Sequence, residues 1–169
     1  MSQKFNDFAH KVRVARKIKP FEGRLLSLDP GQTTGWTVWD CVPGKDDTRV
    51  AHGQLTSWPM KDGVTGFAEL LRVYNPTMTV YESYHIYDWK LETHSFSDVP
   101  TLRIIGGIET QLLQLGIPFT HQSAQVAKTF VTDDRLKDFG YWEKGMKHSR
   151  DAHRHAMYFL CFGITAKEK

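Results

Sequence analysis

The stretch that decides the fold runs Arg24-Leu-Leu-Ser-Leu-Asp29-Pro-Gly-Gln-Thr-Thr-Gly35-Trp-Thr-Val-Trp-Asp40. Its first part is a short apolar run that ends in an acid, which is typical of a buried β-strand. A Pro-Gly pair ends this run, and the residues after Gly35 alternate and are rich in strand formers. The segment therefore predicts two strands joined by a turn, with Asp29 at the end of the first strand.

The rest of the chain extends this beginning into one sheet. A turn at 43–47 and a third strand at 49–58 complete a hairpin. Beyond it the sequence predicts a helix at 64–74, a strand at 78–82, a helix at 100–115, a strand at 117–121, and helices at 123–131 and 148–162. This order predicts an α/β fold with a five-stranded mixed sheet, a hairpin edge plus parallel strands, flanked by helices.

Composition narrows the class of protein. The 169 residues suit one domain, and 40% hydrophobic with 24% charged residues excludes wholesale disorder. No apolar run approaches the ~20 residues of a membrane span, and no apolar segment follows the basic N-terminus as in a secretory signal. Cys41 and Cys161 are isolated, which favours reduced thiols over zinc or a disulfide. We expect a cytoplasmic protein with no membrane partner.

Positive charge is concentrated near the N-terminus. Between residues 4 and 19 the only acid is Asp7, and the cations are Lys4, Lys11, Arg13, Arg16, Lys17 and Lys19. One interpretation is a solvated, frayed arm, and the other is a flexible tether that binds phosphates through counterion release. Both interpretations divide the chain into a basic arm at 1–21 and a single domain at 22–169.

Four side chains are candidates for catalysis and metal binding. Asp29 and Glu82 each end a predicted strand, and ligands of open α/β sheets gather at the carboxyl ends of strands. Two adjacent carboxylates repel each other unless a divalent cation lies between them. His148 and Asp151 lie three residues apart on the last helix, along the border of its apolar face. This oxygen-rich set suits Mg²⁺ or Mn²⁺, and two ions would hold the attacking water and the leaving oxygen of a phosphodiester.

The other polar residues of the last helix receive different interpretations. His155 lies nearer the apolar face and is expected to be a packing residue, while His153 is expected at the surface. Arg150 and Arg154 are expected to point to solvent, where they would contact nucleic acid. An acid at a strand end is often only a turn residue, so the assignment rests on the combination.

The same residues resemble the conserved motifs of the RuvC family of Holliday junction resolvases. Leu28-Asp29-Pro-Gly-x-x-Thr34-Gly35 is similar to the first motif, Thr79-Val-Tyr-Glu82 to the second, and His148-x-x-Asp151-Ala152 to the last. Gln125-Val-Ala-Lys128 resembles a basic helix of the family, and Arg103-Ile-Ile-Gly106-Gly107 its dimer helix. The resemblance runs from about residue 24 to 162, and the compact build is similar to versions carried by phages.

The resemblance implies an RNase H-like fold and a crossover-junction endodeoxyribonuclease that depends on two Mg²⁺ or Mn²⁺ ions. It implies a homodimer that nicks four-way DNA symmetrically in recombination and repair. Lys128 would face the scissile phosphate. The dimer would form through a stripe of Ile105, Ile108, Leu112 and Leu115.

Three segments depart from the family pattern. The basic arm before residue 20 is additional to it. The interval from Glu82 to Gly106 is longer, and it begins with an aromatic loop that contains Tyr84, His85, Tyr87 and Trp89. These rings either tuck under the loop or stack on unpaired bases of a junction. The stretch at 132–147 matches no motif, so the roles of Lys137, Lys144 and Lys147 stay open.

Other functions share parts of this pattern. A monomeric RNase H-like enzyme that trims ribosomal RNA precursors would have the same acids, and so would a general branch or flap nuclease. The Asp29-Pro-Gly-Gln-Thr-Thr-Gly35 stretch also resembles the phosphate loop of actin-like ATPases and sugar kinases, which need two such domains. A metal-free nucleic-acid-binding relic is disfavoured by the intact acids.

Overall fold

Five strands form one sheet in the order β3-β2-β1-β4-β5 in the computed structural model of the chain, which describes residues 2–84 and 99–164. The strands are β1 (Gly23–Asp29), β2 (Thr33–Cys41), β3 (Thr48–Thr56), β4 (Met78–Ser83) and β5 (Phe119–Ser123). The helices within these described ranges are α1 (Ser2–Arg16), α2 (Met60–Tyr74), α4 (Pro100–Leu115), α5 (Ala124–Phe130), α6 (Asp133–Phe139) and α7 (Lys147–Phe162).

The sheet is mixed, as the sequence predicts. β1 pairs with β2 and β2 with β3 in antiparallel fashion, whereas β1–β4 and β4–β5 are parallel. Element bounds differ by a few residues: α2 begins at Met60 rather than Val64, and β5 begins at Phe119 rather than Ile117. The charged stretch after Val131 contains α6, a short helix that the sequence analysis did not predict.

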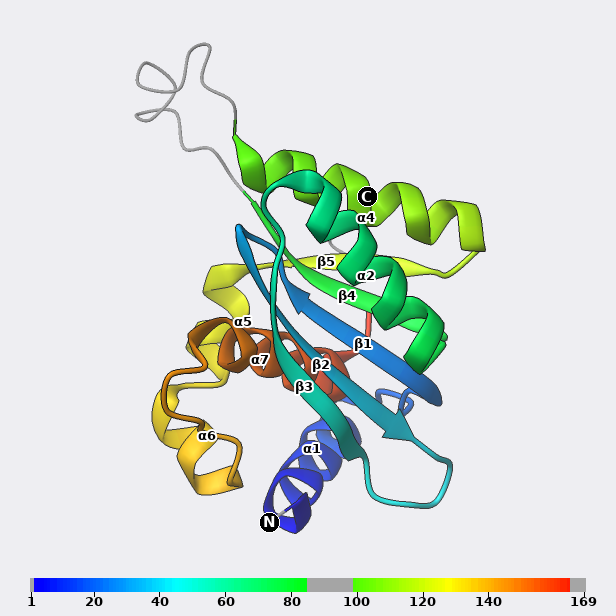
Figure 1. Cartoon of the computed structure of the whole chain (residues 1–169). Helices are drawn as coiled ribbons and strands as arrows, with labels where there is room; N and C mark the ends of the chain where they lie inside the picture. The colour runs from blue at the N-terminus through cyan, green and yellow to red at the C-terminus, as the bar shows by residue number, and fades with distance from the viewer. Residues whose placement is uncertain (1, 85–98, 165–169) are drawn as a thin grey trace.

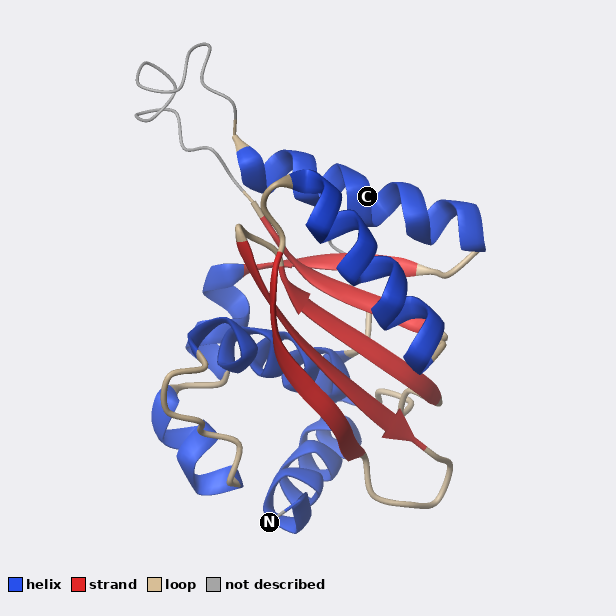
Figure 2. Ribbon diagram, in the orientation of Figure 1, coloured by secondary structure: helices blue, strands red, loops and turns tan. Residues whose placement is uncertain are grey.

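Helices cover both faces of the sheet. Figures 1 and 2 show α2 and α4 on one face and α1, α5, α6 and α7 on the other. Successive residues of a strand point to opposite faces, so β1 sends Leu25 towards α7 and Leu26 and Leu28 towards α2 and α4. Both faces of β1 are buried, which is why its sequence reads as a continuous apolar run.

The N-terminal segment is part of the core, which corrects the expected flexible arm at 1–21. Phe5 and Ala9 of α1 are fully buried, and the Phe5 ring packs against Trp39 at 5.5 Å. The Asn6 side chain donates to the Asp47 carbonyl, and Arg13 donates to the Asp47 carboxylate. The apolar residues of α1 recur at helical spacing, and the surrounding lysines and arginines concealed that pattern in the sequence.

The long helix α4 presents a different face from the one expected. Ile108 and Leu112 are buried against the sheet and α2, so they are not available to a second subunit. Leu102, Leu113 and Leu115 are the apolar side chains of α4 that are exposed. The predicted C-terminus of this helix is confirmed, because Gly116 caps it in the left-handed conformation.

The two cysteines are free and buried, in agreement with reduced thiols. None of the helices within residues 2–84 and 99–164 is long and apolar enough to cross a membrane.

Candidate active site

The candidate acids converge at one edge of the sheet. Asp29 is the last residue of β1, and Glu82 lies near the end of β4, the parallel neighbour of β1. The start of α7 lies across this edge and brings His148 and Asp151 to it. Figure 1 shows the carboxyl ends of β1 and β4 directed towards the side where α5 and the start of α7 lie. The juxtaposition predicted from the strand ends is therefore present.

Asp29 is a buried carboxyl group among other acids. It is 7% exposed, and its Oδ2 atom lies 2.7 Å from Nδ1 of His148. Burial raises the pKa of Asp29 to about 7, and the negative charges of Glu82 and Asp151 add to this effect. The hydrogen bond with His148 acts in the opposite direction and is too weak to cancel it. Asp29 is therefore the acid of the site that most needs a neighbouring cation.

Glu82 has a different environment, which keeps it ionised. Burial acts to raise its pKa, but the hydrogen bond from His155 and the charges of His155 and Lys128 outweigh burial and lower it. Nε2 of His155 lies 3.0 Å from Oε2 of Glu82, and Nδ1 of His155 lies 3.0 Å from Oε1 of Gln122. Gln122 is the register partner of Glu82 on β5.

His155 thus has a role that the sequence analysis missed. The side chain is fully buried, as expected of a packing residue, but it also holds a candidate metal ligand. One signal was present in the sequence: His155 follows Asp151 by four residues, a spacing that places both on one side of a helix. The contact with Glu82 depends on how α7 lies on the sheet, which the sequence pattern did not specify.

Two cationic side chains meet Asp151. Nζ of Lys128 lies 3.3 Å from Oδ2 of Asp151 and 3.5 Å from Oε2 of Glu82, and Arg154 pairs with the other oxygen of Asp151. Burial acts to lower the pKa of Lys128, but the charges of Asp151 and Glu82 exceed this effect and raise it. Lys128 is therefore a bridge between two candidate ligands.

Three other residues of α7 differ from expectation. Arg154 does not point to solvent: it is 8% exposed, donates to the Val131 carbonyl and pairs with two acids. His153 is fully buried rather than at the surface, and burial lowers its pKa to about 3. Arg150 is partly buried, with its guanidinium 4.2 Å over the Trp142 ring. Helical periodicity had placed both arginines on a solvent face, but α5 and the loops around α6 cover that face.

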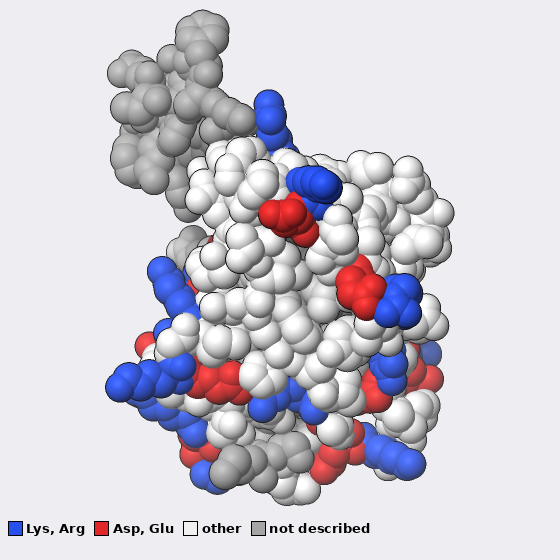
Figure 3. Space-filling model, in the orientation of Figure 1, with Lys and Arg blue, Asp and Glu red and all other residues white. Residues whose placement is uncertain are grey.

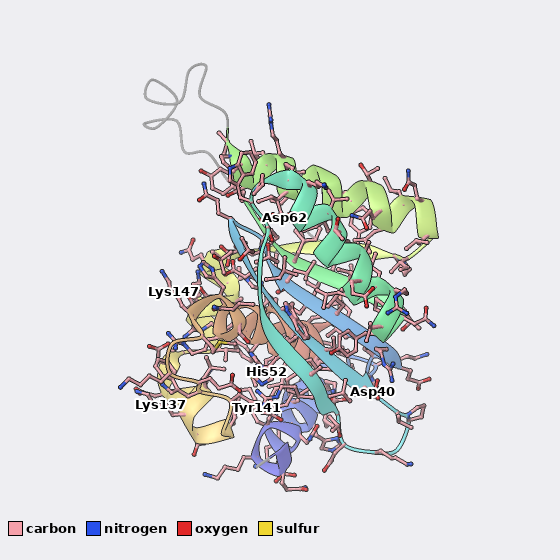
Figure 4. The ribbon with its side chains drawn as sticks, viewed as in Figure 1. Asp40, His52, Asp62, Lys137, Tyr141 and Lys147 are labelled. Atoms are coloured by element: carbon pink, nitrogen blue, oxygen red, sulfur yellow. The ribbon has the colours of Figure 1, made fainter. Side chains whose placement is uncertain are left out.

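A groove of about 460 Å³ runs beside the acids. It is lined by Lys128, Thr132, Asp133, Lys147, Arg150, Asp151 and Arg154. Four of these side chains are cationic, so the groove suits an anionic ligand. Figure 4 shows Lys147 at the start of α7 and Lys137 further along the same side of the molecule.

The aromatic loop is described only at its first residue. The Tyr84 side chain is 37% exposed, next to the end of β4. His85, Tyr87 and Trp89 lie outside the described residues, so their expected stacking on bases stays a prediction.

The donor set fits a hard divalent cation. Asp29, Glu82 and Asp151 supply carboxylate oxygens, and His148 supplies an imidazole nitrogen. The pKa of Asp29 is raised by burial and further by the charges of Glu82 and Asp151, and a bound cation would offset both effects. Within the described ranges no three or more His, Cys, Asp and Glu side chains are already spaced to hold an ion. Each carboxylate is instead paired with a nitrogen group, so an ion has to displace Lys128 from two of them.

Comparisons with known proteins identify the fold. No protein-family model and no curated protein sequence matches the chain. Among solved structures, RuvC of T. thermophilus in complex with a Holliday junction matches at a TM-score of 0.61 and 14% identity, covering 79% of this chain and 90% of RuvC.

Two further resolvases match. The fowlpox virus Holliday junction resolvase has a TM-score of 0.57 at 13% identity, covering 81% of this chain and 97% of its own. The yeast mitochondrial Holliday junction resolvase has a TM-score of 0.55 at 12% identity, with coverage of 90% and 84%. The chain therefore has the RNase H-like fold of these resolvases.

Proposed function

We propose that this protein is a divalent-metal-dependent endonuclease that resolves four-way DNA junctions by paired symmetric nicks. The observation that carries the proposal is the meeting of Asp29, Glu82 and Asp151, with His148, at one edge of a sheet whose fold is that of known resolvases. One of the matching structures is that of T. thermophilus RuvC in complex with a Holliday junction substrate. On this proposal the substrate is branched DNA in the cytoplasm.

The metal ligands are the four side chains at the sheet edge. Asp29, Glu82, His148 and Asp151 would hold Mg²⁺ or Mn²⁺, two ions in each site. When bound, such ions lower the pKa of water and stabilise the charge that develops on a phosphodiester. Carboxylate oxygens suit Mg²⁺, and the imidazole of His148 makes the site compatible with Mn²⁺ as well.

The other residues of the site orient the ligands and the substrate. His155 holds the Glu82 carboxylate, and Arg154 holds one oxygen of Asp151, so both acids have fixed directions. The Lys128 side chain is half-exposed and pairs with Glu82 and Asp151. From this position its ammonium group can leave the two carboxylates and pair with a phosphate oxygen at the same edge of the sheet. We assign to Lys128 the role of meeting the scissile phosphate once cations occupy the site.

The groove beside the acids is the proposed path of the cut strand. Lys128 and Lys147, the latter at the start of α7, are two cationic side chains that line this groove. Arg150 and Arg154 also line this path, but each is held by a neighbour: Arg150 lies over the Trp142 ring, and Arg154 pairs with Asp133. They would contribute fixed positive charge to the path rather than mobile phosphate contacts. Tyr84 and the aromatic residues that follow it would stack on unpaired bases at the branch point.

A homodimer would place two such sites on opposed strands of a junction. The face over α2 and α4 carries few charged side chains, as Figure 3 shows, whereas charged side chains of both signs gather on the lower part of that view. The exposed apolar residues of α4 are Leu102, Leu113 and Leu115, and a side chain at Gly106 would meet nothing within 4 Å. We place the dimer contact on this face, because Ile108 and Leu112 of the expected stripe are buried within the subunit.

The deciding experiment compares substrates. The protein is incubated with Mg²⁺ and equal amounts of a four-way DNA junction, a flap, a plain duplex and a structured RNA, with Asp151→Asn as the matched inactive control. We expect preferential, paired nicking of the junction, because a dimer can meet phosphates with both sites only there. Preferential cutting of RNA would favour an RNA-trimming nuclease, and equal cutting of flaps and junctions a general branch nuclease.

A further inference from the structure

The start of α7 lies on a row of three strand residues. Asp29 on β1, Gly35 on β2 and Gln54 on β3 are register partners across the sheet. Asp29 contacts the His148 ring, and a Cβ atom at Gly35 would lie 2.0 Å from the His148 carbonyl carbon. Oε1 of Gln54 accepts from the backbone N–H of His148 at 3.0 Å and of Ser149 at 3.5 Å. These three residues therefore determine the distance between the start of α7 and the sheet.

We propose that Gln54, on β3, is a positioning residue for the metal site, because its side chain caps the N-terminus of α7. The inference rests on the proposed function. The first N–H groups of a helix have no partner within the helix, and a side chain at the N-cap usually satisfies one of them. The N-cap residue of α7, Met146, makes no such hydrogen bond. Gln54 supplies the missing acceptor.

Capping from β3 has a consequence that a local cap would lack. A local cap stabilises a helix end but does not fix it relative to the sheet, whereas Gln54 does both. His148 and Asp151 lie in the first turn and a half of α7, so a shift or rotation of that end moves both relative to Asp29 and Glu82. Within the described part of the chain, Gln54 is the side chain that bonds the N–H groups of both His148 and Ser149.

A second anchor shows why the position of Gln54 matters. The Ser27 hydroxyl on β1 donates to the Ala152 carbonyl of α7 at 2.8 Å. His52 on β3 lies 3.3 Å from the Ser149 hydroxyl, on the side of β3 that faces α7 in Figure 4. Ser27 holds the helix from the central strand and Gln54 from the edge strand. Without Gln54 the helix retains its attachments to Ser27 and His52 but loses the two hydrogen bonds that hold the backbone of its first turn to β3.

The test uses three variants of the full chain. Gln54→Leu removes the acceptor at similar volume, and Gln54→Glu retains an acceptor and places negative charge at a helix N-terminus, where it is favourable. Thr77→Val is the matched control, because the Thr77 hydroxyl also accepts from a backbone N–H group, that of Arg24 at 3.0 Å, but lies before the start of β4, at the opposite end of the sheet from the candidate site. Each protein is measured for amide exchange at His148 and Ser149, Mn²⁺ affinity by calorimetry, and kcat and KM on a four-way junction.

We expect Gln54→Leu to lose protection at both amides, to bind Mn²⁺ about 10- to 100-fold more weakly and to lose kcat by a similar factor, with KM nearly unchanged. Gln54→Glu restores most of each, and Thr77→Val leaves all three at parental values. Parental Mn²⁺ affinity and kcat in Gln54→Leu, or a loss that Gln54→Glu fails to restore, overturns the proposal. If the parent cuts no junction but the exchange and Mn²⁺ results hold, the proposed function fails while the role of Gln54 stands.

Discussion

Asp29 and Glu82 lie at the carboxyl ends of neighbouring parallel strands, yet the pKa values of their carboxyl groups are shifted in opposite directions. The pKa of Asp29 is raised to about 7, while that of Glu82 is lowered. Burial is the largest effect on the pKa of Asp29, and the charges of Glu82 and Asp151 add to it. At Glu82 the hydrogen bond and charge of His155 and the charge of Lys128 outweigh burial. Without bound cations the site therefore stores repulsion at Asp29.

Asp29→Asn should stabilise the metal-free protein at pH 8. The folded state holds a proton on Asp29 between about pH 4 and 7 that the unfolded state releases, so this contribution to stability is lost as pH rises through 7. An asparagine cannot ionise, so we expect a gain on the order of 2 kcal/mol at pH 8 and a clearly smaller gain near pH 5, where the carboxyl group ionises only in the unfolded state. Thermal melts in EDTA at both pH values measure it, with exposed Asp46→Asn as the control; no gain at pH 8 would contradict the buried charge.

Asp151→Asn should abolish cleavage while leaving junction binding within about twofold. The substitution retains volume but removes the charge that would hold a cation, and Arg154 can still donate to the amide oxygen. Glu82→Gln is expected to behave alike. Single-turnover cleavage and gel-shift titration with the same labelled junction separate the two properties. Substantial residual cleavage by the Asn variant would show that the metal site is elsewhere.

Lys128→Met should bind Mn²⁺ more tightly and cut more slowly. Removing the ammonium group leaves Glu82 and Asp151 without the cation that bridges them, so a divalent ion no longer has to displace it. Loss of the phosphate contact should lower kcat by about 10-fold or more. Calorimetry and cleavage rates test both effects, with Lys137→Met as a control because Lys137 pairs with Asp134. Weaker Mn²⁺ binding would mean that Lys128 supports the ligands rather than competes with a metal.

Gly35→Ala should destabilise the protein and reduce activity together. The added methyl group would overlap the backbone of His148, so α7 must move away from the sheet. We expect a loss of about 1–3 kcal/mol, measured by urea unfolding. Gly44→Ala is a poor control because Gly44 has a positive φ, and Gly66→Ala is better because its nearest contact is a flexible leucine at 3.5 Å. Parental stability in Gly35→Ala would contradict the tight packing of α7.

Leu113→Glu should weaken the proposed dimer without unfolding the subunit. Leu113 is 69% exposed, so a charge there costs the monomer little, whereas it would be buried in a contact through α4. Light scattering at tens of micromolar should show a dimer for the parent and a monomer for the variant. The control variant Val14→Glu places the same charge on the exposed side of α1 and should leave the dimer intact. A monomeric parent, with or without DNA, would instead favour the RNA-trimming alternative.

Much of the fold could be predicted from local sequence pattern. The apolar run before Asp29, the alternation after Gly35 and the glycine after Leu115 correspond to β1, β2 and the end of α4. These features follow from backbone preferences and burial on one or both faces of a strand, which the chain expresses over a few residues.

The failures share a cause. Arg154, His153 and the apolar face of α1 were assigned from periodicity or charge alone, and each is buried by an element distant in the sequence. The same holds for His155 and Gln54, whose partners are on β4 and α7. Pattern gives the side of a helix on which a residue lies, but not what covers that side.

The packing of α1 on α7 has a consequence for how the protein is made. α1 is synthesised early and α7 late, yet Phe5, Met157 and Leu160 belong to one core cluster. Contacts of such high sequence separation form slowly and require both segments to be present. On the ribosome the sheet can pair before α7 emerges, but its α7 face stays uncovered until then. Because α7 also carries His148 and Asp151, the nascent chain cannot assemble its candidate active site before its core closes.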